Sequence, residues 1–360
     1  MIFSNTLSNL LFVSTALLAL TSSTITRYPV DKDPLKCNGF NSLCDLTYDR
    51  VSFILPRSSF AVAKPDTDPS LPATQNLTIS QQLDAGIRAF QFNAFPPAPG
   101  SSGLLQCFPD CTVYNGGQLT DSLNLIYNFL TANTNQIITI FLDNPTKASP
   151  LLFQQAFTSS KLIGFALTKV AQAPWPTLRT MINSNKRLVV IEDSSLGLTP
   201  DLAWVQANTD TVLQTAVVAP EFTPTNWDCS PYVSRGFRSL LSISHYTSIA
   251  STYKNVKIQG LPNNTVASSL NTDLLALHAF ACRSTHPYPW VSFLKVDFYN
   301  PGIPDNIVLG LNSQYIPGDK EENYIPIFSK RVAPMVNSST SNYLKSLSLL
   351  SIITLAISFI

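Results

Sequence analysis

The run Ile137-Ile138-Thr139-Ile140-Phe141-Leu142 is short, rich in β-branched and aromatic residues, and followed by a helical pattern. Such alternation predicts parallel strands joined by crossover helices. The number of strands and helices approaches that of a (β/α)8 barrel, so the expected fold class is α/β, with a TIM-type barrel. Runs of the same character recur at Val51 to Ile54, Ala89 to Phe92, Leu188 to Ile191, Leu240 to Ser244 and Phe293 to Phe298.

Helical signals lie between these runs. Thr78 and Gln81 form a capping-box pattern, and Gly86 is placed to close the helix that they open. A longer helix is expected from Val266 to Ala281, with Leu270, Leu274 and Leu277 on one face.

Both ends of the chain carry apolar segments that predict processing signals. Residues 1–23 have the composition of a secretory signal peptide. Residues 337–360 begin with small polar residues and end in an apolar tail, the order of a GPI-attachment signal, with Asn337 or Ser338 as the expected attachment residue. The tail is shorter than the roughly 20 apolar residues of a membrane-spanning helix. A tail anchor or a buried helix is the alternative.

Residues 24–336 are long enough for one large α/β barrel, so a single domain is expected. Charged residues make up 12% of the chain and the formal net charge is +1, which argues against a nucleic-acid partner. If both terminal signals operate, the protein is secreted and held on the outer face of the plasma membrane or in the cell wall by a lipid anchor.

Six cysteines favour three disulfides in a secreted chain. Proximity suggests Cys37 with Cys44 and Cys107 with Cys111, which leaves Cys229 with Cys282, although six cysteines allow fifteen connectivities. Zinc binding is the rival interpretation, but no Cys-x-x-Cys pair occurs. Sequons at Asn76, Asn263 and Asn337 predict N-glycosylation.

Several ordered landmarks resemble the X-domain family of phosphatidylinositol-specific phospholipase C, in particular its secreted fungal members. They are Cys37-Asn38-Gly39, Gln82-Leu83-Asp84-Ala85-Gly86-Ile87-Arg88, Cys107 and Cys111 before Gly116-Gly117, Trp175-Pro176-Thr177-Leu178, Lys186-Arg187-Leu188-Val189-Val190 and Val296-Asp297-Phe298-Tyr299. The resemblance implies a distorted TIM-type barrel whose active site lies at the C-terminal ends of the strands.

The resemblance also implies an inositol phosphodiesterase reaction that needs two histidines, one as general base and one as general acid. This chain lacks both. Arg57 stands where the first histidine of the family is expected, and arginine is never deprotonated in a protein. Phe108 follows the first cysteine of Cys107-Phe108-Pro109-Asp110-Cys111, the position of the second histidine, and has no proton to donate.

Gln91 and Asn93 replace the aspartate and arginine of bacterial relatives, and amides weaken any calcium site of the animal type. Asp143 is the carboxylate that remains there. The expected pocket-lining residues are Arg57, Ser58, Gln91, Asn93, Asp110, Asp143, His245 and Asp297.

Some of these residues have two interpretations. Arg57 with Ser58 could hold a phosphate or form a surface salt bridge, and Asp110 could act as an acid or end a turn. His245 is expected to form structural hydrogen bonds, His278 to pack in the core and His286 to lie in an exposed loop.

The sequence therefore predicts a catalytically degenerate barrel that binds a phosphoinositide, phospho-sugar, lipid head group or glycan. An active phosphodiesterase with substitute residues is one alternative, and a structural wall or adhesion protein is another. Motifs of other hydrolases and phosphate-binding glycine loops are missing from the sequence, so no cofactor or metal is expected.

Overall fold

The computed structural model describes residues 33–63, 72–170, 173–192, 202–216, 228–230, 239–247, 250–253, 255–260, 262–285, 290–300, 302 and 304–312. The two terminal signals, the candidate attachment residues Asn337 and Ser338, and His286 lie outside these residues.

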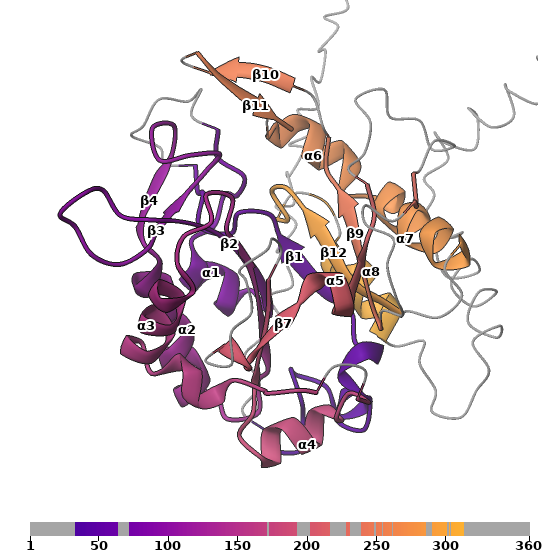
Figure 1. The fold of residues 1–360 in the computed structure, drawn as a ribbon. Coiled ribbons are helices and arrows are strands. Elements are labelled where there is room, and N and C mark those ends of the chain that lie inside the picture. Colours follow the sequence, from indigo (N-terminus) through magenta and orange to yellow (C-terminus); the bar gives the residue numbers. More distant parts are fainter. Residues whose placement is uncertain are drawn as a thin grey trace, which may run out of the picture.

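Parallel strands follow one another in chain order around a barrel, with helices on its outside (Figure 1). One sheet contains β2, β5, β6 and β7, and the other contains β8, β9, β12 and β1. This arrangement matches the TIM-type architecture expected from the sequence. The barrel strands are β1 (Phe53–Pro56), β2 (Ala89–Phe95), β5 (Ile138–Asp143), β6 (Leu188–Glu192), β7 (Val205–Ala207), β8 (Val212–Gln214), β9 (Leu240–His245) and β12 (Trp290–Val296).

The barrel ladder has two interruptions among the described residues, between β7 and β8 and between β1 and β2. At the second, the loop after β1 bridges the strands, because the Ser59 amide donates to the Gln91 carbonyl at 2.9 Å and the Gln91 amide donates to Ser59 Oγ at 2.9 Å. The barrel is therefore distorted rather than uniformly closed.

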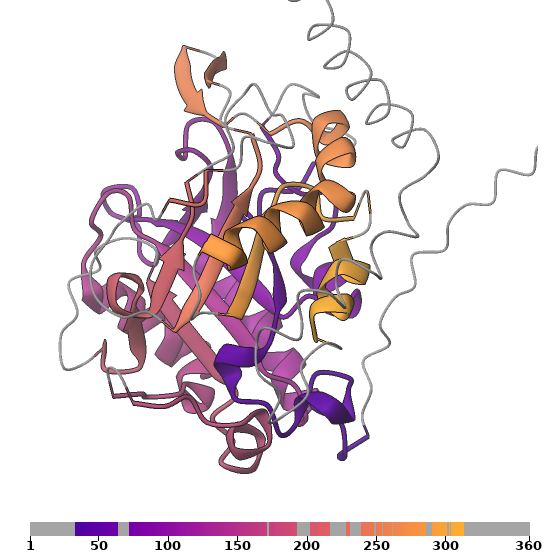
Figure 2. The ribbon, with the colours of Figure 1, turned by 90° about the vertical axis from the view of Figure 1, so that its right-hand side faces the viewer.

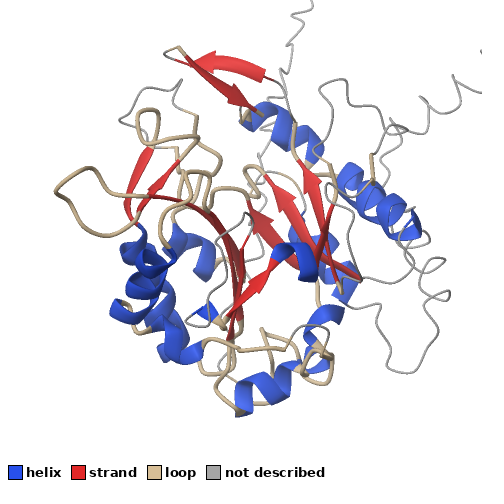
Figure 3. Cartoon of the chain, in the orientation of Figure 1, coloured by secondary structure: helices blue, strands red, loops and turns tan. Residues whose placement is uncertain are grey.

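Two hairpins extend from the end of the barrel at which the parallel strands finish (Figures 1 and 3). One follows β2 and the other follows β9, and both lengthen the walls around the expected site. They consist of β3 (Leu105–Cys107) with β4 (Asn115–Gln118), and of β10 (Ala250–Tyr253) with β11 (Val256–Gln259).

The helices cover the outer surface of the barrel, and α6 and α7 cross in front of β9 and β12 in the turned view (Figure 2). The capping box is present, with Thr78 accepting from the Gln81 amide. The helical elements are η1 (Asn41–Leu43), η2 (Tyr48–Arg50), α1 (Ile79–Asp84), α2 (Leu119–Ala132), α3 (Pro150–Ser159), η3 (Leu162–Phe165), α4 (Leu178–Asn183), α5 (Asn208–Thr211), α6 (Asn264–Leu270), α7 (Asp273–Thr285) and α8 (Pro304–Asn312).

The single helix expected from 266 to 281 is wrong, because the chain breaks it at Asn271. The side-chain Nδ2 of Asn271 donates to the backbone carbonyls of Asp297 and Phe298 at 2.9 and 3.0 Å. These long-range hydrogen bonds hold Asn271 where the helix would otherwise continue. Of the expected apolar face, Leu270 is buried and Leu274 is half-buried, but Leu277 is 45% exposed, so the prediction is wrong for Leu277. The face buried against the barrel contains Leu275, Ala276, His278, Ala279 and Cys282.

The structure confirms the two disulfides that proximity suggested, Cys37–Cys44 and Cys107–Cys111, and the remaining pair, Cys229–Cys282. The first two close short loops, whereas the third joins cysteines 53 residues apart. None of the helices that the structure describes has the length and hydrophobicity needed to cross a bilayer.

Candidate functional site

Arg57 directly follows β1 and Asp297 directly follows β12, its parallel neighbour in the sheet. Their side chains form a two-point ion pair, with Arg57 Nε 2.6 Å from Asp297 Oδ1 and Arg57 Nη2 2.6 Å from Asp297 Oδ2. Nη2 also donates to the Gly260 carbonyl at 2.8 Å. Every N–H of these two nitrogens is therefore committed within the protein.

Two aromatic rings contact the same guanidinium. Its carbon lies 4.2 Å from the ring centroid of Tyr246 and 5.2 Å from that of Phe108. Both distances are within the range of cation–π attraction. Arg57 and Phe108 are each 6% exposed, so the positions at which the resemblance places two histidines are packed against each other.

Burial and charge act in opposite directions on this pair. Desolvation lowers the pKa of Arg57, but the charge and hydrogen bonds of Asp297, together with Tyr246, raise it, and the net pKa lies above its usual value. For Asp297, desolvation raises the pKa of the carboxyl, against the effects of Arg57 and the buried Lys295. The guanidinium is a permanent cation here and cannot accept a proton.

Ser58, Gln91, Asn93 and Asp143, from β2, the end of β5 and the residue pair after β1, lie together. Ser58 Oγ donates to Asn93 Oδ1 at 2.7 Å, and Asn93 Nδ2 donates to Asp143 Oδ2 at 3.0 Å. The Ser58 amide donates to Gln91 Oε1 at 3.1 Å. The polar groups thus satisfy one another.

This cluster does not fit a calcium ion. Calcium takes six to eight oxygen ligands, with several carboxylates among them. Here Asp143 supplies one carboxylate, and the side-chain oxygens of Asn93 and Gln91 already accept hydrogen bonds. No step of any reaction is assigned to a metal at this position.

Asp110 stabilises a turn, and its carboxylate is engaged by hydrogen bonds within that turn. Its Oδ1 accepts from the Thr112 amide at 2.8 Å, from the Thr112 hydroxyl at 2.6 Å and from the Val113 amide at 3.2 Å. These bonds form an Asx turn that begins within the Cys107–Cys111 loop and ends just after it.

His245 is at the end of β9, but its side chain faces the helices. Side chains alternate along a strand, and the neighbouring Ile243 on that face packs in the core cluster that includes α7. His245 Nδ1 lies 2.9 Å from His278 Nδ1, and its Nε2 lies 3.0 Å from the Leu270 carbonyl. Burial lowers the pKa of His245 to about 4, and burial and His245 lower that of His278. The side chain of His245 is therefore engaged with His278 and with the Leu270 carbonyl.

The two sequon asparagines among the described residues, Asn76 and Asn263, form local hydrogen bonds. Asn263 Oδ1 caps α6 by accepting from the Val266 amide at 3.1 Å. Asn76 Nδ2 lies 3.3 Å from Asn300 Oδ1.

Two participants in the site were missed by sequence reasoning, Tyr246 and Gly260. Tyr246 could have been found, because it follows a strand end on the face where barrel sites lie. The Gly260 carbonyl had no such signal, because it reaches Arg57 across 203 positions of the chain.

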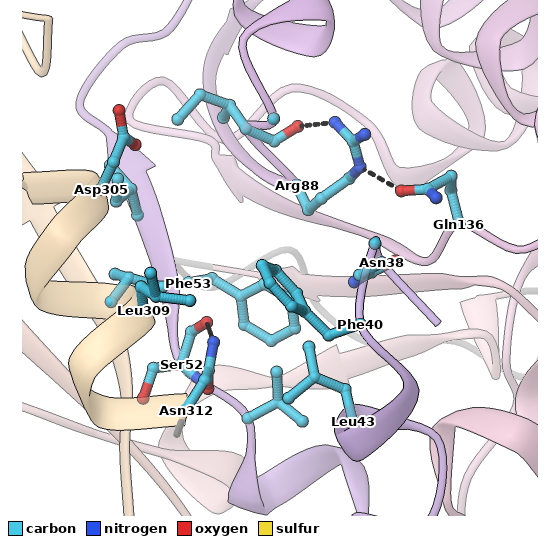
Figure 4. A pocket seen from close by; sticks show the side chains of 16 residues that line it. Asn38, Phe40, Leu43, Ser52, Phe53, Arg88, Gln136, Asp305, Leu309 and Asn312 are labelled. Atoms are coloured by element: carbon cyan, nitrogen blue, oxygen red, sulfur yellow. Dashed lines mark hydrogen bonds between the residues drawn. The ribbon is translucent and has the colours of Figure 1, made fainter. Parts of the chain in front are cut away.

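One small cavity of the described residues lies beside Asp297. The cavity lined by His245, Tyr246, Asn263 and Asp297 has a volume of about 10 Å³, enough for roughly one water molecule. A cavity of about 200 Å³ lies elsewhere, at the end of the barrel where β1 and β2 begin (Figure 4). Arg88 borders it and donates to Gln136 at 2.7 Å. Asp305 also lines it, and burial raises the pKa of that carboxyl to about 6.

Comparison with known proteins adds sequence evidence. The profile of the family described as PI-PLC X 1 matches residues 43–302. A PI-PLC X domain-containing protein 1 from Arthroderma benhamiae is 30% identical over 194 residues, which cover 53% of this chain and 60% of that protein. An uncharacterized secreted protein from the same fungus is 26% identical over 177 residues, which cover 48% of this chain and 38% of that protein. The chain thus spans less than two thirds of the length of either relative.

Among solved structures, a phosphatidylinositol-specific phospholipase C from Listeria monocytogenes aligns with a TM-score of 0.48 at 13% identity, covering 76% of this chain and 98% of the other. The family profile spans β1 to β12 and includes Arg57 and Phe108. The chain belongs to the PI-PLC X family, the X-domain family of phosphatidylinositol-specific phospholipase C.

Proposed function

We propose that this chain is a non-catalytic PI-PLC X protein with a structural or adhesive role at the cell surface. The observation that carries the proposal is the buried Arg57–Asp297 pair, covered by Phe108.

The chemistry of the family requires a base and an acid on opposite sides of the phosphate. Each such group typically contributes about 100-fold to 10,000-fold to the rate. Arg57 is held as a cation by Asp297, and Phe108 has no titratable group. Asp110 is engaged in its turn and His245 faces α7, so neither replaces a lost histidine.

The packing also argues against binding of a phosphoinositide, phospho-sugar or glycan at this point. An anion would need the guanidinium that Asp297 already holds at two points, and the adjoining cavity is about 10 Å³. Releasing Arg57 would strand a buried carboxylate, which is costly. The engagement of the guanidinium by Asp297 favours the structural role over head-group binding.

The proposed location is outside the cell. Residues 1–23 would be removed as a signal peptide, residues 24–336 would form the barrel domain, and residues 337–360 would direct GPI attachment. Three disulfides support an oxidising compartment, and one relative is described as secreted. Glycans at Asn76 and Asn263 belong to the same proposal.

A phosphodiesterase assay tests the catalytic part. The purified protein is incubated with phosphatidylinositol vesicles, beside a bacterial phosphatidylinositol-specific phospholipase C as the positive control. We expect no turnover above the buffer rate. Turnover that disappears in the Asp143→Asn or His245→Asn variant would replace the proposal with an active enzyme that uses a substitute residue.

The Arg57→His/Phe108→His variant asks whether the two positions alone account for the loss. An imidazole at position 57 would lie beside Asp297, which is the way a base is commonly oriented. For location, cells are treated with a bacterial phosphatidylinositol-specific phospholipase C. Release of the intact protein is expected, and a variant lacking residues 337–360 should enter the medium instead.

A further inference from the structure

A buried cluster of sulfur and imidazole groups lies between the end of β9 and α7, outside the site described above. One ring nitrogen of His278 and the Sγ atoms of Cys229 and Cys282 lie within 4.8 Å of one another. His278 and Cys282 are four residues apart on α7 and therefore share a helix face. Cys229 is 8% exposed, His278 is 1% exposed and Cys282 is fully buried.

Hydrogen bonding determines which nitrogen of His278 carries a lone pair. The Leu270 carbonyl only accepts, so His245 Nε2 carries a proton and donates it there at 3.0 Å. Neutral His245 then accepts at Nδ1, and the 2.9 Å bond between the two Nδ1 atoms is donated by His278. His278 is left with its lone pair on Nε2.

These hydrogen bonds resemble those that orient a histidine ligand in a metal site. A metal-binding histidine usually donates its other ring N–H to an acceptor that fixes the ring and its tautomer. His278 donates in this way to His245, which is itself held by a backbone carbonyl. The ring of His278 is therefore oriented in advance.

We propose that reduction of the Cys229–Cys282 disulfide creates a binding site for one zinc ion, with Cys229 Sγ, Cys282 Sγ and His278 Nε2 as ligands. His245 is the positioning residue. The site is separate from Arg57 and does not depend on the proposed function.

The chemistry balances with a thiol reductant. Two electrons pass to the disulfide, the S–S bond breaks, and two cysteine thiols form while two thiols of the reductant join as a disulfide. Zinc then binds the two sulfurs, and the two thiol protons leave to solvent. Two thiolates, one neutral imidazole and Zn²⁺ sum to zero charge, which suits a buried site. Water would complete the tetrahedron.

The movement required is small. Zinc–sulfur bonds of about 2.3 Å in a tetrahedron separate two sulfurs by about 3.8 Å, compared with about 2.05 Å in a disulfide. The Cα atoms of the two cysteines are 4.9 Å apart. Rotation about the Cα–Cβ bonds can provide the extra separation.

The experiment measures metal content in the full chain. Protein reduced with a phosphine is dialysed with zinc and then desalted, and zinc per chain is measured by mass spectrometry. We expect one ion per reduced chain and none per oxidised chain. Replacing zinc with cobalt should give the ligand-field and charge-transfer bands of a tetrahedral sulfur and nitrogen site.

Matched variants distinguish this site from the other cysteines. The ion should be lost in Cys229→Ser/Cys282→Ser and kept in Cys107→Ser/Cys111→Ser and Cys37→Ser/Cys44→Ser. His278→Gln should weaken zinc binding at least 10-fold, and His245→Asn about 10-fold to 100-fold. Three results would each overturn the proposal. They are zinc retained by the Cys229→Ser/Cys282→Ser protein, an unchanged zinc affinity in His278→Gln, and no zinc bound to the reduced chain, whether or not that chain stays folded.

Discussion

The guanidinium carbon of Arg57 lies 5.2 Å from the ring centroid of Phe108, so the two residues that the family resemblance places at the histidine positions contact each other. Asp297 holds the same guanidinium at two points, and the ring centroid of Tyr246 lies 4.2 Å from its carbon. In the proposed non-catalytic role, this one cluster accounts both for the missing proton-transfer groups and for a guanidinium that is already engaged.

Arg57→Met should lower the free energy of unfolding by about 3–5 kcal/mol, because the Asp297 carboxylate is left buried without its partner. Chemical denaturation measures this. The side chains of Arg57 and Asp297 are 7% and 6% exposed. The Arg57→Met/Asp297→Leu double variant should be more stable than Arg57→Met alone. Arg179→Met is the control, since its pair with Asp45 is 43% and 74% exposed and should contribute at most about 1 kcal/mol. Equal losses in Arg57→Met and Arg179→Met would contradict the importance of the buried pair.

Phe108→Ala should destabilise the protein by about 3 kcal/mol, since it removes a buried ring and leaves a cavity beside Arg57. It should produce no phosphodiesterase activity, because opening the space restores neither an acid nor a base. Phe108→Leu is the control, keeping most of the volume while losing the cation–π contact. Thermal unfolding and the vesicle assay measure the two effects. Activity in Phe108→Ala would mean that the ring merely blocks a working site.

The two buried histidines should make the fold sensitive to acid. Their pKa values are lowered in the folded state, that of His245 to about 4, whereas an unfolded histidine titrates near 6.5. The contribution of the two neutral histidines to the free energy of unfolding is fully present above about pH 6.5. It falls as the pH drops toward about 4, because the unfolded state binds protons first.

Denaturation of the unmodified protein and of His278→Gln at several pH values checks this expectation. The difference between the two should shrink as the pH falls from 7 to 4. The pKa of Asp305 is raised to about 6, so its contribution to the free energy of unfolding increases as the pH falls. Both proteins contain Asp305, so this contribution cancels when their free energies of unfolding are subtracted. A difference that does not change with pH would show that His278 is not held neutral.

The Cys229–Cys282 disulfide should contribute more stability than Cys107–Cys111. The sequence separations are 53 and 4 residues, which correspond to about 4 and about 2 kcal/mol from the loop-closure entropy of the unfolded chain. Unfolding of the two double serine variants measures the contributions. The opposite ranking would indicate that native-state packing outweighs this entropy.

Local signals predicted several elements correctly. The strand from Ile138 to Asp143 followed from residue type, and the cap at Thr78 followed from two residues three positions apart. The helix from Val266 to Ala281 could not be predicted correctly in the same way. It is broken because Asn271 donates to carbonyls 26 and 27 positions further along the chain.

The sequence by itself determined that neither residue 57 nor residue 108 can exchange a proton near neutral pH, because the identity of a residue limits its proton chemistry wherever it lies. Only the tertiary structure decided that Arg57 pairs with Asp297, 240 positions away, and that His245 contacts His278 of α7. The reason is physical. Titration is a property of one side chain, whereas pairing and facing depend on strand register and on which distant segments the barrel brings together.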